Sequence, residues 1–189
     1  PKQVGRLLRT IDAYPGSFVV SCALKIAPYV FVRPGELQHA RWEDIDFEAC
    51  EWRYTTSKTN TPHIVPLAPQ VMAILKDLQD LTGHQEWVFP SMRQKGEPMG
   101  KTTILAALRA MGITDEEMTP HGFRAMARTL LDEVLGERYD LIEHQLAHMV
   151  RDPNGRAYNR TVHLAERKRM MARWADYLDE LRADVGQIA

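Results

Sequence analysis

The sequence contains little cysteine, with Cys22 and Cys50 as the only two among 189 residues. Two thiols outside a Cys-x-x-Cys pair make no disulfide framework in a chain of this size, so we expect both to be buried and reduced. A long apolar run is also missing. The most apolar stretch, residues 17–32, contains Lys25 and Pro28 and is shorter than the roughly 20 residues of a membrane span. We therefore expect neither a disulfide-stapled scaffold nor a membrane protein.

The sequence has no excess of charge of either sign. Lys and Arg number 24 and Asp and Glu 25, which gives a net charge of −1 and a pI near 6.8. This balance excludes a histone-like coat for nucleic acid, whose pI typically exceeds about 9. However, residues 114–150 carry 3 basic and 8 acidic side chains, whereas residues 151–169 carry 6 basic and 2 acidic ones. Near-neutrality therefore excludes broad electrostatic coating of DNA but allows a focused phosphate site.

Apolar residues make up 44% of the sequence, and their spacing is helical over most of its length. Helices are predicted over residues 3–13, 17–29, 69–81, 101–111, 121–135, 141–149 and 163–183, with a short one opened by residues 33–37. Residues 42–66 alternate as strands do, and a polar turn divides them into a β-hairpin with Lys58 at or near its tip. We expect a mostly α fold with a small antiparallel β-sheet (α+β), in one domain of residues 1–189.

His121 and Arg124 open a predicted helix that follows the pair Thr119 and Pro120. Their spacing of three places both on one face, beside the unpaired N–H groups and the partial positive charge of a helix N-terminus. Such a pair favours an anion, most naturally a phosphate group. The other interpretation is a surface His and Arg without a ligand.

His144 and His148 are four residues apart in the next predicted helix and would share a face. The spacing resembles part of the His-Glu-x-x-His zinc motif, but Gln145 replaces its Glu and no third ligand has a suitable spacing. We therefore expect no metal ion. His148 is interpreted as a hydrogen-bond donor and His144 as a residue of the helix surface.

Tyr158 follows a turn signal at residues 152–155 and lies between Arg156 and Arg160. A phenol with a pKa of about 10 is a poor nucleophile at neutral pH, and lowering that pKa by about three units requires about 4 kcal/mol of preferential phenolate stabilisation. Two guanidinium groups in a dry pocket would provide it. An ordinary packed or surface tyrosine is the other interpretation.

Six residues with this chemistry occur in a specific order: Arg33, Lys58, His121, Arg124, His148 and Tyr158. Together they resemble the catalytic set of the tyrosine recombinases, the phage integrase family. The resemblance covers nearly the whole chain, including RPGEL at residues 33–37 and HGFR at residues 121–124. It is nearest to integrases of prophages and genomic islands of the satellite-phage kind. One departure is Ala147, where many relatives have Gly, and we expect it to leave the chemistry unchanged.

The resemblance implies a tyrosine recombinase catalytic-domain fold and site-specific DNA strand exchange by transesterification. Arg33 and Arg124 would hold the scissile phosphate and stabilise the added charge of its transition state. Tyr158 would attack the phosphorus, which leaves a 3′-phosphotyrosine and a free 5′-hydroxyl. The reaction would integrate or excise a prophage or genomic island.

The resemblance also implies the remaining roles. Lys58 would protonate the 5′-oxygen as general acid, His121 would assist proton transfer at the tyrosine, and His148 would donate a hydrogen bond to a phosphate oxygen. Acidic residues near these motifs, such as Glu36, would orient arginines rather than bind magnesium. We expect no cofactor, ATP or metal ion, because the covalent link retains the energy of the phosphodiester.

Partners follow from the same resemblance. They are double-stranded DNA attachment sites, other integrase subunits in a synaptic tetramer, and accessory DNA-bending or directionality proteins, in the bacterial cytoplasm and nucleoid. The chain would be the C-terminal catalytic part of a longer integrase, without its N-terminal DNA-binding domains. The helix over residues 163–183 is expected to pack on its own domain, and the alternative is docking of the last residues on a neighbouring subunit.

Three other functions remain open from the sequence. A type IB topoisomerase uses similar arginine, lysine, histidine and tyrosine chemistry to relax DNA. A catalytically silent DNA-binding module would form no covalent complex. A metal-dependent phosphodiesterase would use His121, His144 and His148, but it would leave Arg33 and Tyr158 without a role.

Overall fold

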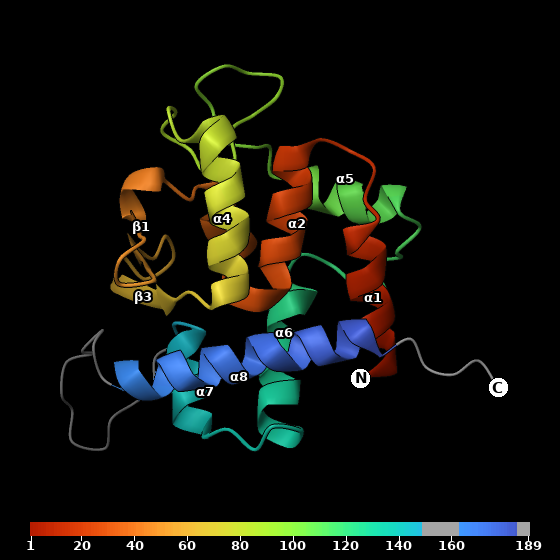
Figure 1. Cartoon of the computed structure of the whole chain (residues 1–189), viewed down its shortest axis with the longest axis vertical. Coiled ribbons are helices and arrows are strands. Elements are labelled where there is room, and N and C mark those ends of the chain that lie inside the picture. The colour runs from red at the N-terminus through yellow and green to blue at the C-terminus, as the bar shows by residue number, and fades with distance from the viewer. Residues whose placement is uncertain (149–162, 185–189) are drawn as a thin grey trace.

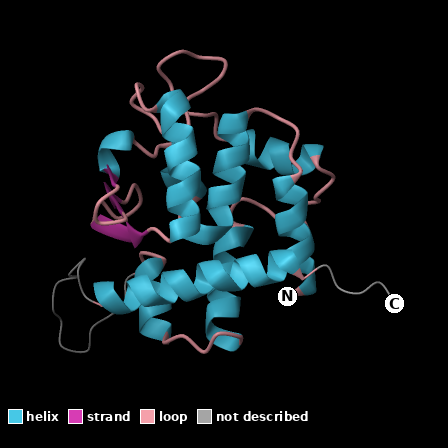
Figure 2. Cartoon of the chain, viewed as in Figure 1, coloured by secondary structure: helices cyan, strands magenta, loops and turns pink. Residues whose placement is uncertain are grey.

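Helices form most of the fold, as the apolar periodicity predicts (Figures 1 and 2). The computed structural model describes residues 1–148 and 163–184. Its helices are α1 (Lys2–Asp12), α2 (Phe18–Val30), α3 (Pro34–Gln38), α4 (Pro69–Thr82), α5 (Thr103–Ala110), α6 (Gly122–Glu133), α7 (Tyr139–Gln145) and α8 (Leu164–Ala183). Its strands are β1 (Ile45–Asp46), β2 (Glu51–Thr55) and β3 (Pro62–Pro66), and a 3₁₀ turn, η1 (Trp42–Asp44), precedes β1. The predicted mostly α fold with a small antiparallel sheet is confirmed.

The sheet has three antiparallel strands in the order β1–β2–β3. β2 and β3 form the predicted hairpin, in which Trp52 pairs with Val65 and both side chains are buried. Threonines close the connecting turn: Thr56 N–H donates to Thr61 O at 2.9 Å, and the two hydroxyl oxygens are 3.0 Å apart. Lys58 lies in this turn and is exposed, so the hairpin presents its ammonium group to solvent.

Helix α2 is the centre of the helical core. It packs against α1, α4, α5, α6 and α8, and Figure 1 shows it between α4 and α1 with α8 crossing below. Ala23 and Leu24 of this apolar helix are fully buried. Ser17 caps the first turn as predicted, because its hydroxyl accepts a hydrogen bond from Val20 N at 3.4 Å. Contacts on so many sides fix the C-terminal end of α2, which Arg33 follows closely in sequence.

Helix α8 packs along the body of its own domain. Trp174 is fully buried, and its indole N–H donates to Pro28 O at 2.9 Å. At the other end, α8 approaches α1 so closely that a Cβ added to Gly5 would lie 2.2 Å from Leu181 O. Arg9 also reaches across from α1 and donates to Leu181 O at 3.3 Å.

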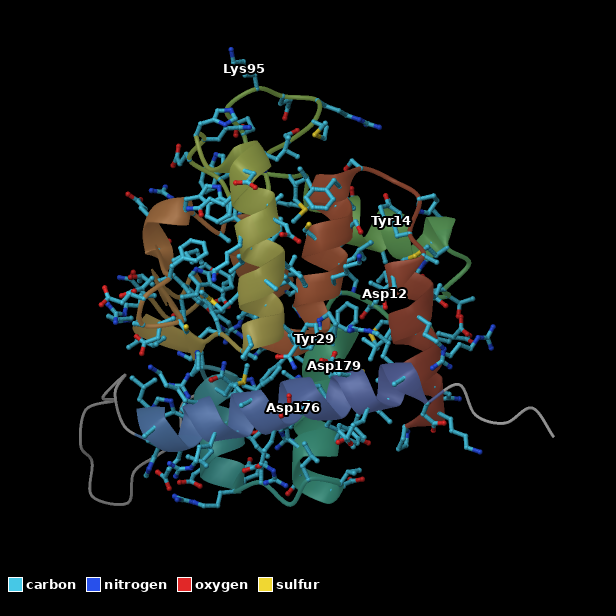
Figure 3. The ribbon with its side chains drawn as sticks, viewed as in Figure 1. Asp12, Tyr14, Tyr29, Lys95, Asp176 and Asp179 are labelled. Carbon is cyan, nitrogen blue, oxygen red and sulfur yellow. The ribbon has the colours of Figure 1, made fainter. Side chains whose placement is uncertain are left out.

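A side-chain hydrogen bond and an ion pair reinforce the packing of α8, and Figure 3 labels Tyr29, Asp179 and Asp12, which take part in them. The phenol of Tyr29 donates to Asp179 Oδ1 at 2.6 Å, and Arg182 Nε lies 3.0 Å from Asp12 Oδ2. The expected packing of this helix on its own domain is therefore confirmed. The alternative, in which the last residues dock on a neighbouring subunit, stays a prediction, and residues 185–189 lie outside the described part of the chain.

Helix α7 ends at Gln145, four residues earlier than predicted. Its end is a Schellman motif: Ala147 N–H donates to His144 O at 3.1 Å, and His148 N–H donates to Glu143 O at 3.0 Å. Ala147 has a φ of 51°, in the left-handed region that such a motif requires. The prediction that His144 and His148 share a helix face is therefore wrong, because His148 lies beyond the helix end.

Helix α6 begins at Gly122, with His121 as its N-cap residue. The predicted capping pair, Thr119 and Pro120, forms the turn before it, and the Thr119 hydroxyl accepts from Gly122 N at 3.1 Å. The start of the helix thus differs by one residue from the prediction. Arg124 remains in its first turn.

The cysteines match the expectation only in part. Cys22 is buried in α2, and burial raises the pKa of its thiol to about 11. Cys50 is half-buried beside the hairpin and has a left-handed φ of 52°. Both are unpaired thiols. Over residues 1–148 and 163–184, no helix combines the length and apolarity needed to cross a membrane.

We predict that Gly5→Ala destabilises the fold, because the new methyl group would collide with the backbone of α8. The free energy of unfolding should fall by about 1–3 kcal/mol, as for overpacked sites. Gly35→Ala is the matched control: it is also a helical glycine, and its Cβ meets nothing within 4 Å. The control should be neutral or stabilising by up to about 1 kcal/mol. Urea unfolding measures both, and equal stabilities of the two variants would contradict the close approach.

Candidate active site

Three of the predicted site residues converge from different elements. Arg33 is the N-cap residue of α3, Arg124 lies in the first turn of α6, and His148 follows α7. Arg124 NH2 lies 3.3 Å from His148 Nε2, and Arg33 NH2 donates to the neighbouring Ala147 O at 3.4 Å. The fold therefore brings together two guanidinium groups and an imidazole that are far apart in sequence.

Glu36 orients Arg33, as expected for an acidic residue at this site. Its carboxylate is buried and accepts from Arg33 NH1 at 3.0 Å and from Arg33 N at 3.2 Å. The phenol of Tyr54 also donates to Glu36, at 2.9 Å. Burial and the Glu36 charge hold the pKa of Tyr54 well above its usual value, so Tyr54 stays a neutral donor. The buried carboxylate of Glu36, which belongs to α3, therefore links Arg33 to Tyr54 of the hairpin and fixes the position of Arg33.

Backbone carbonyl groups hold Arg124. Its NH1 donates to Phe31 O at 3.0 Å, and its NH2 donates to Leu146 O at 2.8 Å. Phe31 has a left-handed φ of 37° at the end of α2. Burial and the nearby charge of Arg33 lower the pKa of Arg124. Two cations held this close make a site in which an anion is favourable.

Glu143 orients His148. The imidazole Nδ1–H donates to Glu143 Oε2 at 2.7 Å, and Arg128 Nε donates to the other carboxylate oxygen at 2.6 Å. Burial raises the pKa of Glu143, but the hydrogen bonds from Arg128 and His148 outweigh burial and lower it. This pairing leaves Nε2 of His148 directed at Arg124, where a protonated ring could donate to a bound anion.

Lys58 and His121 stand apart from this group. Both are exposed, and over residues 1–148 and 163–184 no hydrogen bond or ion pair joins either side chain to Arg33, Arg124 or His148. A surface cavity of about 410 Å³, lined by Glu36, Tyr54 and Ser57 among others, reaches from Glu36, the partner of Arg33, to the hairpin turn. Lys58 follows Ser57, so its turn borders the same cavity.

Tyr158, the predicted nucleophile, lies outside the described residues, together with Arg156 and Arg160. His144 is buried rather than on the helix surface, with 6% of its area exposed, because α7 turns that face into the domain. His121, His144 and His148 do not form one cluster. Within the described ranges, no group of three or more His, Cys, Asp or Glu side chains is placed to hold a metal ion.

Sequence reasoning missed Tyr54, Arg128 and Glu143 as parts of the site. Tyr54 was recognisable only as one of the alternating residues of a strand. Glu143 precedes His148 by five residues, a spacing that carries no meaning in a continuous helix. The spacing matters here because the Schellman motif folds the chain back, so that His148 lies next to Glu143 in the last turn of α7.

Paired arginines, an oriented histidine and a mostly helical fold with a β-hairpin match what the resemblance to the phage integrases predicts for this chain. The Phage integrase family profile matches residues 1–161, and the chain belongs to that family. It is 39% identical over 188 residues to the integrase of Enterobacteria phage P4, which covers 91% of this chain and 43% of that protein. It is 37% identical over 190 residues to the prophage integrase IntA of Escherichia coli K12, which covers 100% of this chain and 45% of that protein.

Solved structures show the same fold. The integrase of mycobacterium phage Brujita has a TM-score of 0.69 at 17% identity, over 97% of this chain and 62% of that one. The XerA recombinase has a TM-score of 0.62 at 17% identity, over 95% of this chain and 62% of that one. The chain spans less than half the length of the curated relatives it matches.

We predict that Ala147→Gly stabilises the domain. Glycine adopts the left-handed conformation of residue 147 without strain, and the free energy of unfolding should rise by about 1 kcal/mol. Ala73→Gly, at an exposed right-handed position in α4, is the matched control and should lower it by about 1 kcal/mol. Urea unfolding measures both. A loss of stability in both variants would show that residue 147 is not strained.

Proposed function

We propose that this chain is the catalytic part of a site-specific DNA recombinase, an integrase that inserts or excises a prophage or genomic island. Its reaction would cleave and rejoin DNA through a 3′-phosphotyrosine. The observation that carries the proposal is the convergence of Arg33, Arg124 and His148. Glu36 holds Arg33, backbone carbonyls hold Arg124, and Glu143 holds His148. Membership of the phage integrase family supports it.

The arginines act on the scissile phosphate. Arg33 and Arg124 each keep N–H groups beyond those that bind carbonyl or carboxylate oxygens, and these donate to the non-bridging oxygens. Charge on those oxygens grows in the pentavalent transition state, so fixed cations stabilise it more than the ground state. His148 donates from Nε2 to the same phosphate while Glu143 holds its Nδ1–H.

Tyr158 supplies the nucleophile. Its oxygen forms a bond to phosphorus as its proton leaves with help from His121, and the bond from phosphorus to the 5′-oxygen breaks. Lys58 donates a proton to that 5′-oxygen, which departs as a hydroxyl group. Rejoining reverses these steps with a 5′-hydroxyl from the partner strand. Because one phosphodiester replaces another, the cycle consumes no ATP and needs no metal ion.

The partners are attachment-site DNA, further integrase subunits in a synaptic tetramer, and accessory DNA-bending or directionality proteins, in the bacterial cytoplasm and nucleoid. Residues 1–189 act as one catalytic domain, and DNA-binding domains N-terminal to it would provide most of the DNA affinity. The near-neutral charge of the chain supports this division.

The nucleophile can be tested by substitution. Tyr158→Phe should bind nicked attachment-site DNA as the unmodified chain does but form no covalent adduct on it, because the attacking oxygen is absent. Tyr139→Phe is the matched control, since Tyr139 is an exposed tyrosine of α7, and it should keep the adduct. Denaturing gels of protein on labelled DNA measure both. An adduct that persists in Tyr158→Phe and disappears in Tyr139→Phe would overturn the assignment.

The general acid can be tested with a sulfur leaving group. Lys58→Ala should slow cleavage by about 10²–10⁴-fold, and a substrate with a bridging 5′-sulfur should restore the rate, because a thiolate leaves without a proton. Lys95→Ala, at an exposed position in the loop at the top of Figure 3, should cleave both substrates normally. Cleavage by Lys58→Ala that stays slow on the sulfur substrate would remove Lys58 from this role.

A further inference from the structure

Arg167 of α8 is a charged side chain with no exposed surface, at 0%. Its Nε donates to Gln145 Oε1 at 3.0 Å, and its NH2 donates to the same oxygen at 2.6 Å. NH2 also donates to Ile64 O of β3. Taking a guanidinium group out of water is unfavourable, and an apolar side chain of similar volume often gives equal or greater stability at such a site. The burial of Arg167 therefore indicates a positional role.

Gln145 extends these contacts to the hairpin. It is the last residue of α7, only 2% exposed, and its carbonyl accepts from His63 Nε2 at 3.2 Å. Burial, together with the nearby charges of Arg167 and His144, lowers the pKa of His63 to about 3, so its ring is neutral. Arg167 therefore binds the side chain of Gln145, and His63 binds its backbone carbonyl.

The contacts continue to the arginine site. His63 pairs with Tyr54 in the hairpin register, and their rings meet edge to face at 5.6 Å. Tyr54 donates to Glu36, which holds Arg33. A continuous series of buried and half-buried side chains thus runs from α8 through the end of α7 and the hairpin to Arg33, a proposed phosphate-binding residue.

Each element in this series lies next to a proposed catalytic residue. β3 follows the turn that carries Lys58, and Gln145 precedes His148 by three residues. α8 begins six residues after Tyr158 in sequence. Arg167, which belongs to α8, contacts both β3 and Gln145 directly.

We propose that Arg167 is a positioning residue, which acts through Gln145 and His63 to fix the hairpin, the His148 segment and the start of α8 relative to one another. The proposal rests on the proposed function. A displacement of about 1 Å of catalytic groups can slow a reaction by about a hundredfold, so loss of this cross-link should slow strand cleavage even when the fold and DNA binding persist.

The test compares Arg167→Met, Gln145→Met and the double variant. Each single variant should bind nicked attachment-site DNA within about twofold of the unmodified chain, but form the covalent adduct between about tenfold and about a hundredfold more slowly. The double variant should be no slower than the worse single one, because both remove the same link. Arg173→Met is the matched control: Arg173 lies on the same helix, 58% exposed and paired with Glu137, and its loss should leave the cleavage rate unchanged.

A second measurement is independent of catalysis. Amide hydrogen exchange should become faster in Arg167→Met at residues 56–61 and 146–148, with α1 and α2 unchanged, and Arg173→Met should show neither effect. Normal cleavage in a folded Arg167→Met or Gln145→Met variant would overturn the proposal. A uniform increase in exchange, with a rate loss that parallels the loss of thermal stability, would also overturn it.

These outcomes separate the positioning proposal from the proposed function. An unmodified chain that forms no adduct on attachment-site DNA contradicts the recombinase function, and hydrogen exchange still decides whether Arg167 holds the three segments together. Adduct formation that is equal in all variants, with the exchange rates unchanged, supports the recombinase function and contradicts the positioning role.

Discussion

The site depends on holding two like charges together. Arg33 and Arg124 lie close enough that the charge of Arg33, with burial, lowers the pKa of Arg124. In the described part of the chain only Glu36 forms an ion pair with either arginine. Backbone carbonyls at the ends of α2 and α7 accept further hydrogen bonds from both arginines, and His148 Nε2 lies beside Arg124. Carbonyl groups satisfy N–H donors without cancelling the charge, so the pair stays attractive to an anion.

The rest of the structure resists that repulsion. The carbonyls are presented by helix ends with left-handed residues, Phe31 at a φ of 37° and Ala147 at 51°, which persist only because the surrounding packing determines them. Phe31 ends α2, the helix at the centre of the core, and Ala147 lies in the Schellman motif that ends α7. α8 braces this arrangement along its length, with Trp174 and Arg167 both buried on its inner side. The core therefore serves the site by keeping two helix ends in place.

Local patterns predicted most of the secondary structure, because helix and strand periodicity depend on neighbouring residues. The helices and the hairpin were recovered with small shifts at their ends, and Glu36 orients Arg33 as expected. The failures occur where local spacing competes with tertiary structure. The spacing of His144 and His148 suggests one helix face. The helix ends before His148 because Ala147 adopts a left-handed conformation that usually requires Gly, and an alanine does not indicate a helix end.

The sequence by itself determined the fold class and the family, because periodicity is local and the six site residues keep their order along the chain whatever their positions in space. Only the tertiary structure decided which partner each polar group takes. The contacts of Tyr54 with Glu36, and of Arg167 with Gln145 and Ile64, join elements that approach one another when the core packs. No spacing rule encodes such pairs, since the burial that makes each hydrogen bond necessary arises from the assembled fold.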